Sequence, residues 1–226
     1  MKRHFDDDLT RFNTSLLEMA AMTEQVIFRS TEALKNRDAG LAREVISSDE
    51  AIDDMEIAID EQAIDLLALY QPMAIDLRFI TTGMHINADL ERIADLAVNI
   101  SNRVVDLADQ PHLKPLVDIP KLSDVARTMV KKSIDAFVNR NEDLAKEVIL
   151  SDEKSDLLRN AIVKELIYDY MVKDGTTAPR AVSLLLIARD LERICDHAVS
   201  IAQDVIYMIR AVVVKHHPEN LDNPEA

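Results

Sequence analysis

Apolar residues recur along this chain at alternating spacings of four and three, which is the pattern of an amphipathic helix with one buried stripe. One stripe contains Ile86, Leu90, Ile93, Ala97, Ile100, Val104 and Leu107. A second stripe with the same spacing contains Ile187, Leu191, Ile194, Ala198, Ile201, Val205 and Met208. Heptad stripes of this length predict long helices that pack lengthwise against their neighbours at a shallow angle.

Prolines, glycines and asparagines divide the chain into segments with helical periodicity. The predicted helices cover residues 6–37, 41–70, 74–108, 121–140, 143–172 and 178–215. The chain has only three glycines, which leaves few of the tight turns that β-hairpins need. The sequence therefore predicts an all-α protein of six long helices.

The two halves of the chain repeat each other. The string AREVISSDEAID in the second predicted helix aligns with AKEVILSDEKSD in the fifth, and DLERIADLAVNI in the third aligns with DLERICDHAVSI in the sixth. A repeat of this length indicates that one structural unit occurs twice. We therefore predict a tandem repeat of two antiparallel three-helix bundles, over residues 1–110 and 121–226, joined by a proline-rich linker over residues 111–120.

Each half carries two pairs of acidic residues four positions apart, one pair on each of two consecutive helices. In antiparallel helices, residues equally distant from the connecting turn lie at equal heights. Asp53 and Glu91 are each 19 residues from Pro72, and Asp49 and Asp95 are each 23 residues from it. We therefore expect the first half to gather four carboxylates at two matched levels on its outer flank.

The second half repeats this arrangement around the turn at residues 174–175. Asp156 pairs in height with Glu192, and Asp152 pairs with Asp196. Like charges at helical spacing repel by roughly 0.2–0.5 kcal/mol per pair. A multivalent cation would relieve that repulsion, and oxygen-only ligands suit Mg²⁺, Mn²⁺, Ca²⁺ or an oxygen-bridged iron cluster.

Composition narrows the possible partners and compartment. The formal net charge is −15, which repels nucleic acid, so we expect no nucleic-acid partner. The single cysteine, Cys195, excludes an internal disulfide framework and fits a reducing compartment. The N-terminal string MKRHFDDDLT lacks the apolar core of a signal peptide, and no apolar run reaches the ~18 residues of a membrane span. A cytoplasmic protein without a transmembrane segment is expected.

The motif D-L-E-R-I-x-D-x-A-V-x-I, present once in each half of a six-helix repeat, resembles the PhoU family, whose members are accessory regulators of bacterial phosphate-specific transport. The resemblance extends over nearly the whole chain. It implies a homodimeric, non-enzymatic negative regulator that keeps the phosphate-starvation (Pho) regulon off when phosphate is plentiful. The implied partners are the ATP-binding subunit of the phosphate ABC transporter and the phosphate-sensing histidine kinase, which would bring the protein to the inner membrane as a peripheral component.

The resemblance also implies metal binding on the bundle surface, by a divalent metal or an iron cluster (Mg, Mn, Fe or Zn). The residues that match the E-x-x-x-D motif directly are Glu91, Asp95, Glu192 and Asp196. The further candidates on the preceding helices are Asp49, Asp53, Asp152 and Asp156. Asn87 is replaced by Ala188 in the second copy, which allows the two sites to differ in occupancy.

Two other interpretations stay open at this point. Acidic pairs are common on solvated helices, and Arg92 and Arg193 can neutralise their own helix faces, which favours a metal-free helical scaffold. A metal-dependent hydrolase that activates a bound water is the second alternative.

Overall fold

The computed structural model describes residues 2–215 and 221, and every regular element in that part of the chain is helical. The elements are α1 (Lys2–Asn36), α2 (Ala39–Ser47), α3 (Asp49–Tyr70), α4 (Ile75–Ala108), α5 (Asp118–Asn139), α6 (Glu142–Glu165), the π-helical turn η1 (Leu166–Met171), the 3₁₀ turn η2 (Gly175–Thr177) and α7 (Ala178–Arg210). The predicted all-α class is confirmed. None of the described helices is both long and apolar enough to cross a membrane.

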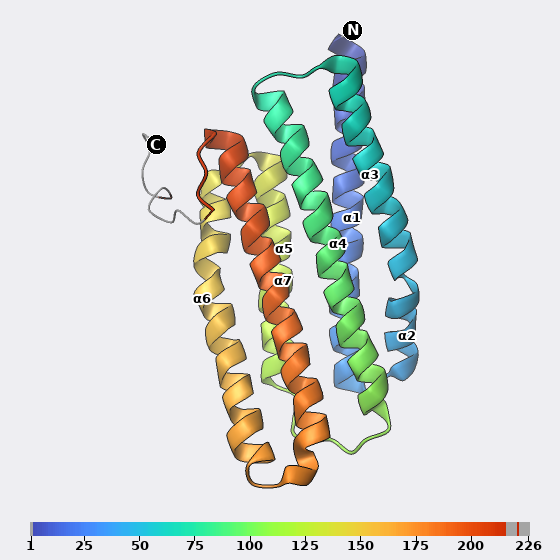
Figure 1. Cartoon of the computed structure of the whole chain (residues 1–226), viewed down its shortest axis with the longest axis vertical. Helices are drawn as coiled ribbons and strands as arrows, with labels where there is room; N and C mark the ends of the chain where they lie inside the picture. The colour runs from blue at the N-terminus through green and yellow to red at the C-terminus, as the bar shows by residue number, and fades with distance from the viewer. Residues whose placement is uncertain (1, 216–220, 222–226) are drawn as a thin grey trace.

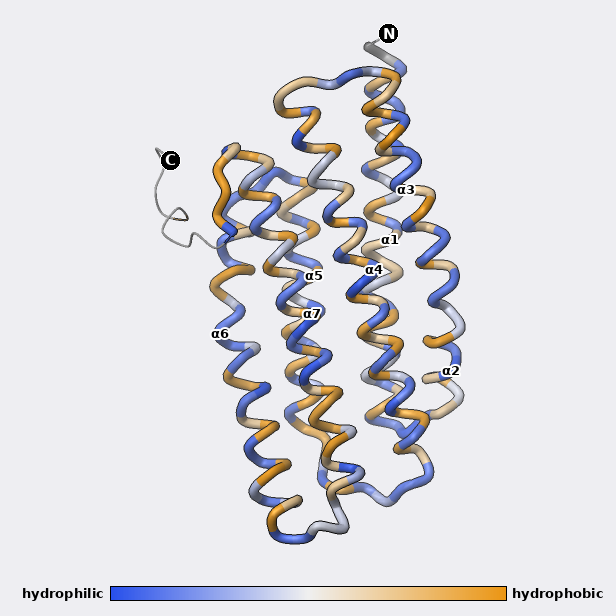
Figure 2. Tube along the Cα trace, in the orientation of Figure 1, coloured by the Kyte–Doolittle hydropathy of each residue, from blue (hydrophilic) through white to orange (hydrophobic). Residues whose placement is uncertain are grey.

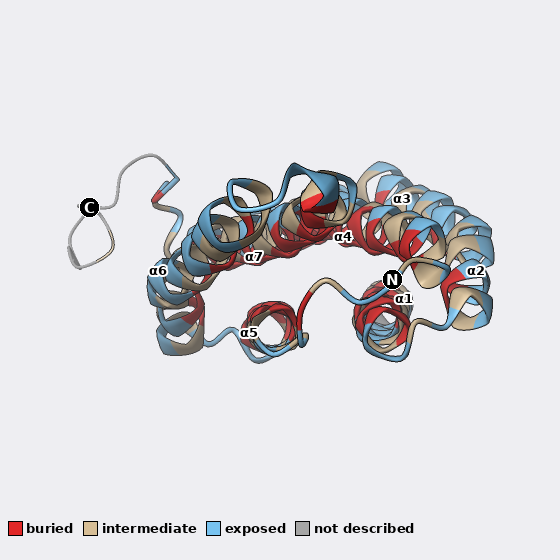
Figure 3. Cartoon of the chain, turned by 90° about the horizontal axis from the view of Figure 1, so that it is seen from below, coloured by how far each residue is buried: buried red, intermediate tan, exposed pale blue. Residues whose placement is uncertain are grey.

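The long helices lie nearly parallel to one axis, with α4 and α7 side by side at the centre (Figure 1). Helix α3 flanks α4 and helix α6 flanks α7, so these four helices form one curved row. Helices α1 and α5 lie on the concave side of that row (Figure 3). The buried faces of the two layers point toward each other, and one hydrophobic core runs through both halves.

The two heptad stripes form the centre of this core. Every position of the stripe in α4 and every position of the stripe in α7 is buried, with Leu90 and Leu191 fully enclosed. Hydrophobic and hydrophilic residues alternate along each helix in Figure 2, as expected for helices with one buried face. The alternation of four and three therefore identified the core face of both helices.

The predicted helix over residues 41–70 is divided in two at Ser48. The hydroxyl group of Ser47 donates to the carbonyl of Glu44 (3.0 Å), and that of Ser48 donates to the carbonyl of Val45 (2.7 Å). Neighbouring serines whose hydroxyl groups bind the preceding turn in this way commonly bend or interrupt a helix. The break makes Asp49 the first residue of α3.

Other predicted boundaries also need correction. Helix α1 begins at Lys2 rather than at residue 6. Helix α5 begins at Asp118, inside the predicted linker, because proline is tolerated in the first turn of a helix and Pro120 lies there. The helix predicted over residues 143–172 changes from α to π hydrogen bonding at Leu166.

The last helix ends at Arg210 rather than at residue 215. Ala211 takes a left-handed backbone conformation (φ 58°), and its N–H donates to the carbonyl of Tyr207 (2.8 Å). A left-handed residue of this kind terminates a helix. The end of the predicted second bundle, residues 216–220 and 222–226, lies outside the described residues.

Candidate metal centre

The structure brings Asp49, Asp53, Glu91 and Asp95 together on the outer seam between α3 and α4, and we call this group the first acidic cluster. Asp49 is repelled by Asp53 on its own helix and by Asp95 on the neighbouring helix. Glu91 is repelled by Asp95 and, across the seam, by Asp53. The heights deduced from the distances to Pro72 therefore agree with the structure.

Crowding raises the pKa values of carboxyl groups in this cluster. Loss of hydration is the largest cause of the raised pKa of Asp49, followed by repulsion from Asp53 and Asp95. Loss of hydration also raises the pKa of Glu91, followed by the charges of Asp95 and Glu56. Both effects disfavour the ionised form, so this seam holds negative charge at a cost that a bound cation would offset.

Two acids of α3 extend the first cluster beyond the residues predicted for it. Loss of hydration raises the pKa of Glu56, and the charges of Asp60 and Asp53 raise it further. Counting from Asp53, Glu56 is at i+3 and Asp60 is at i+7, so all three share one helix face. That spacing was visible in the sequence and could have identified both residues.

The side chain of Asn87, one turn before Glu91 in α4, links α4 to α3. Its Nδ2 donates to the backbone carbonyl of Glu56 (2.9 Å) and to Oδ1 of Asp60 (3.0 Å). Asn87 is fully buried, and its Oδ1 has no hydrogen-bond partner within the described part of the chain. The α3–α4 seam therefore has a buried amide group beside the first acidic cluster, and the equivalent residue in the second half, Ala188, offers none.

The second acidic cluster consists of Asp152, Asp156, Glu192 and Asp196, and it lies on the seam between α6 and α7. Partial desolvation, followed by the charges of Glu192, Asp152 and Asp156, raises the pKa of Asp196 to about 6, although its side chain is exposed. Loss of hydration also raises the pKa of Asp152, and the charge of Asp156 raises it further. The four predicted residues therefore meet in the second half as well.

Arg159 enters this second cluster, and the sequence-based prediction did not include it. Its Nη2 donates to Oε1 of Glu192 (2.7 Å) and to Oδ1 of Asp156 (3.2 Å). Aligning the two copies of the repeat, which are 103 residues apart here, places Arg159 opposite Glu56. A residue-by-residue comparison of the two copies would have revealed this reversal of charge.

The two halves are also joined by polar contacts between α4 and α7. Nδ1 of His197 lies 2.8 Å from Oδ1 of Asp89, and Nη1 of Arg103 donates to the buried Asp190 (2.6 Å). Burial raises the pKa of Cys195 to about 12, so its thiol is unsuited to nucleophilic chemistry. The contacts of His197 and Arg103 connect the two bundles, whereas Cys195 is buried within the second half.

The residues of the first cluster fit a hard cation by their chemistry, since carboxylate and amide oxygens are the ligands such ions prefer. Their positions are not preformed: within residues 2–215 and 221, no three Asp, Glu, His or Cys side chains are placed to hold one metal ion. A cation would have to draw the mutually repelling carboxylates inward. The second cluster fits less well, because Arg159 already binds two of its four acids.

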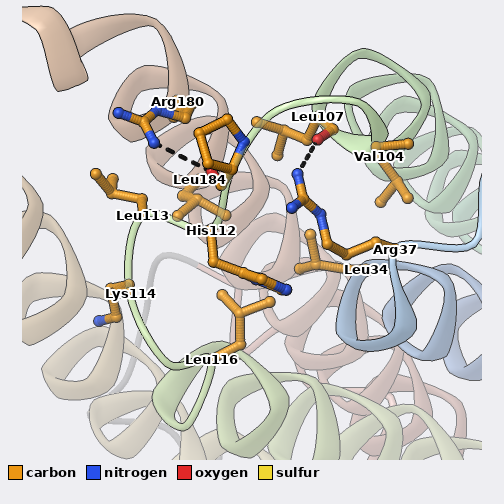
Figure 4. Close-up of a pocket in the computed structure, with 12 residues that line it drawn as sticks. Leu34, Arg37, Val104, Leu107, His112, Leu113, Lys114, Leu116, Arg180 and Leu184 are labelled. Atoms are coloured by element: carbon orange, nitrogen blue, oxygen red, sulfur yellow. Dashed lines mark hydrogen bonds between the residues drawn. The ribbon is translucent and has the colours of Figure 1, made fainter.

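A small cavity lies away from both clusters, where the linker meets the ends of α1 and α4 and the start of α7 (Figure 4). Arg37 donates to the carbonyl of Leu107, and Arg180 donates to that of Pro111 (3.1 Å). The cavity volume is about 30 Å³, which is room for about one water molecule. Arg37 therefore fixes the end of α4, and Arg180 fixes the start of the linker.

The fold is a duplicated three-helix bundle, and its two acidic clusters lie on the outer surface. The model of the PhoU domain matches residues 16–104 and 119–205, and the chain belongs to the PhoU family. The phosphate-specific transport system accessory protein PhoU homolog of Aquifex aeolicus is 39% identical over 209 residues, covering 92% of this chain and 94% of that protein. The homolog of Rhizobium meliloti is 36% identical over 205 residues, covering 90% and 86%.

Solved structures agree with this assignment. The crystal structure of PhoU from Pseudomonas aeruginosa has a TM-score of 0.88 and 33% identity, with coverage of 92% of this chain and 100% of that one. The phosphate transport system regulatory protein PhoU from Streptococcus pneumoniae has a TM-score of 0.86 at 26% identity, with coverage of 93% and 99%. The family consists of regulatory accessory proteins rather than enzymes, so the hydrolase alternative is rejected.

Proposed function

We propose that this protein is a negative regulator of phosphate uptake and of the Pho regulon, and that it acts as a metal-binding adaptor between the phosphate ABC transporter and its sensor kinase. The observation that carries this proposal is the match of the PhoU domain to both halves of the chain, together with relatives named as accessory proteins of phosphate-specific transport. The absence of a described membrane-spanning helix accords with a peripheral role through partners.

The proposed metal role rests on the donor chemistry of the first acidic cluster. Asp49, Asp53, Glu91 and Asp95 would hold the ion, which would supply positive charge to a seam where four carboxylates repel one another. The unpartnered Oδ1 of Asn87 lies on the same helix, one turn before Glu91. Mg²⁺ or Mn²⁺ suits this oxygen-only set, while Fe and Zn remain candidates through the family resemblance.

Such an ion would favour one arrangement of α3 against α4, because it binds carboxylates from both helices at once. The acidic seam would then have a fixed shape and a smaller negative charge. We propose that a homodimer presents this seam to the ATP-binding subunit of the transporter and to the phosphate-sensing histidine kinase in the cytoplasm. The mechanism is recognition of a fixed surface, with no bond made or broken.

The test combines repression and metal content. In a strain that lacks this protein, the wild type should restore repression of a phosphate-starvation reporter in phosphate-rich medium. The double variant Glu91→Ala/Glu192→Ala should lose the bound metal, measured by elemental analysis of the purified protein, and should derepress the reporter. Failure of the wild type to repress would reject the regulatory proposal, and an unchanged metal content in the variant would reject the metal site.

A further inference from the structure

Arg159 places a positive charge in the second acidic cluster, where a metal ion would otherwise bind. One nitrogen, Nη2, contacts carboxylates on both sides of the seam: Asp156 on α6 and Glu192 on α7. The Nε of Arg159 is buried without a partner among the described residues, so this position is adopted although one N–H stays unsatisfied. The two carboxylates are the reason for that position, since charge-assisted hydrogen bonds are the stronger kind.

The first half has the opposite charge at the equivalent positions. Glu56 stands where the repeat has Arg159, and Asp60 stands where it has Val163. The same difference in charge distinguishes the two halves as a whole. Residues 1–110 contain 10 basic and 22 acidic residues, a net charge of −12, whereas residues 111–226 contain 16 and 19, a net charge of −3. The first half is therefore the stronger attractor of cations.

We propose that Arg159 is a built-in counter-ion that occupies one level of the second cluster, so that the two clusters are unequal metal sites. This inference rests on the proposed metal-binding function. A cation enters the first cluster at low concentration, whereas the second cluster accepts one only when the Arg159 guanidinium leaves Asp156 and Glu192. Arg159 thereby decides which seam carries the metal.

Arg159 neutralises only one of the two levels. Asp152 and Asp196 form the other level, and their mutual repulsion is not relieved by the guanidinium. Two carboxylates hold a hard cation less tightly than four, because water must then supply more of its oxygen ligands. Tight binding at the second cluster therefore calls for all four acids, and the ion pairs of Arg159 compete directly with a bound metal.

The experiment is a Mn²⁺ titration of the full chain, followed by electron paramagnetic resonance of the free ion. The second cluster is isolated by the background substitutions Glu91→Gln and Asp95→Asn. In that background, Arg159→Glu should tighten Mn²⁺ binding by about tenfold or more, because a charge adjacent to the ion changes sign. Arg159→Gln should tighten it by less, and it serves as a second variant if the first fails to fold. The reciprocal change Glu56→Arg in the wild type should weaken the first site by about tenfold.

Arg193→Gln is the matched control. Arg193 lines a surface groove together with Arg159, Glu192 and Asp196, but it is exposed and makes no ion pair within the described residues. It should change the Mn²⁺ affinity by less than about twofold, since exposed charges are screened. Unchanged binding in both Arg159 variants, or equal tightening by Arg193→Gln, would overturn the inference. If the wild type binds no Mn²⁺ at all, the proposed metal function itself fails, which is a distinguishable result.

Discussion

The α3–α4 seam and the α6–α7 seam share their buried apolar stripes and differ in the residues beside their acids. Both central helices carry the same buried heptad stripe, and both seams place four acids at two matched levels. Beside those acids, one seam has Glu56 and a buried Asn87, whereas the other has Arg159 and Ala188. Packing constrains the apolar stripe of a repeat, while the positions beside the stripe tolerate substitution, so each copy can acquire its own chemistry without losing the fold.

The largest expected effect is on the free energy of unfolding and concerns the buried core, which the two halves share. Leu90→Ala and Leu191→Ala should each lower the free energy of unfolding by about 2–5 kcal/mol, because both leave a cavity in a fully enclosed site. Both losses should fall within that range, since both positions belong to one continuous core. Urea unfolding in the presence of a chelator measures both values. A small cost at one position only would show that the two halves are packed differently.

The next effect is on Mn²⁺ affinity and concerns the acidic clusters, in which the two halves differ. Glu91→Gln should weaken Mn²⁺ binding at the tighter site at least about tenfold, or ~1.4 kcal/mol, because it removes a charged ligand that no other residue replaces. Glu192→Gln should leave the tighter site nearly unchanged, because Glu192 belongs to the second acidic cluster, where it is already bound to Arg159. Calorimetric titration of the two variants checks this, and equal losses in both would argue for two equivalent clusters.

A smaller effect is expected at Asn87. Asn87→Ala removes two hydrogen bonds between α4 and α3 and should destabilise the protein by about 1–2 kcal/mol. Asn99→Ala is the control on the same helix, and it should stay within about 0.5 kcal/mol because Asn99 is exposed. Thermal unfolding of both variants provides the measurement. A similar cost for the two substitutions would mean that Asn87 does not hold the seam together.

The smallest expected effect depends on pH. In the folded protein the pKa of Asp196 is about 6, above its ordinary value of 3.8, so the ionised form is disfavoured by folding. Asp196→Asn should therefore raise the stability at pH 7, in the presence of a chelator, by about 0.5–1 kcal/mol after allowance for the exposure of the side chain. Well below pH 3.8 the wild-type group is protonated in both states, so the gain should fall away from about pH 6 downward and vanish there. A gain that persists at low pH would assign the effect to something other than charge.

Hydrophobic periodicity was sufficient to predict the helices that form the core. The fourteen stripe positions of α4 and α7 are all buried, because a heptad stripe leaves a long helix only one face to bury. Equal distance from the turn also brought Asp53 opposite Glu91, since antiparallel helices have a fixed rise per residue. These features depend on regular geometry, which spacing in a sequence encodes directly.

Other features depend on local hydrogen bonds that compete with the regular hydrogen bonds of the α-helix, and hydrophobic periodicity does not describe these. The break at Ser48 arises because hydroxyl groups bind backbone carbonyls of the preceding turn. The π-helical turn after Glu165 and the early end of α7 at Arg210 are likewise local departures within apolar segments. Arg159 does not belong to the repeated acidic pattern, so that pattern alone does not predict it; only the charge reversal against Glu56 in the aligned copies indicates it.

The central claim is that the first acidic cluster binds a cation more readily than the second. Crystals grown with Mn²⁺ and measured near the manganese absorption edge locate the ion by anomalous scattering. We predict one strong peak between α3 and α4, in contact with the carboxylates of Asp53 and Glu91, and a weaker peak or none between α6 and α7. Peaks of equal height at both seams, or a strong peak beside Glu192 alone, would contradict the account.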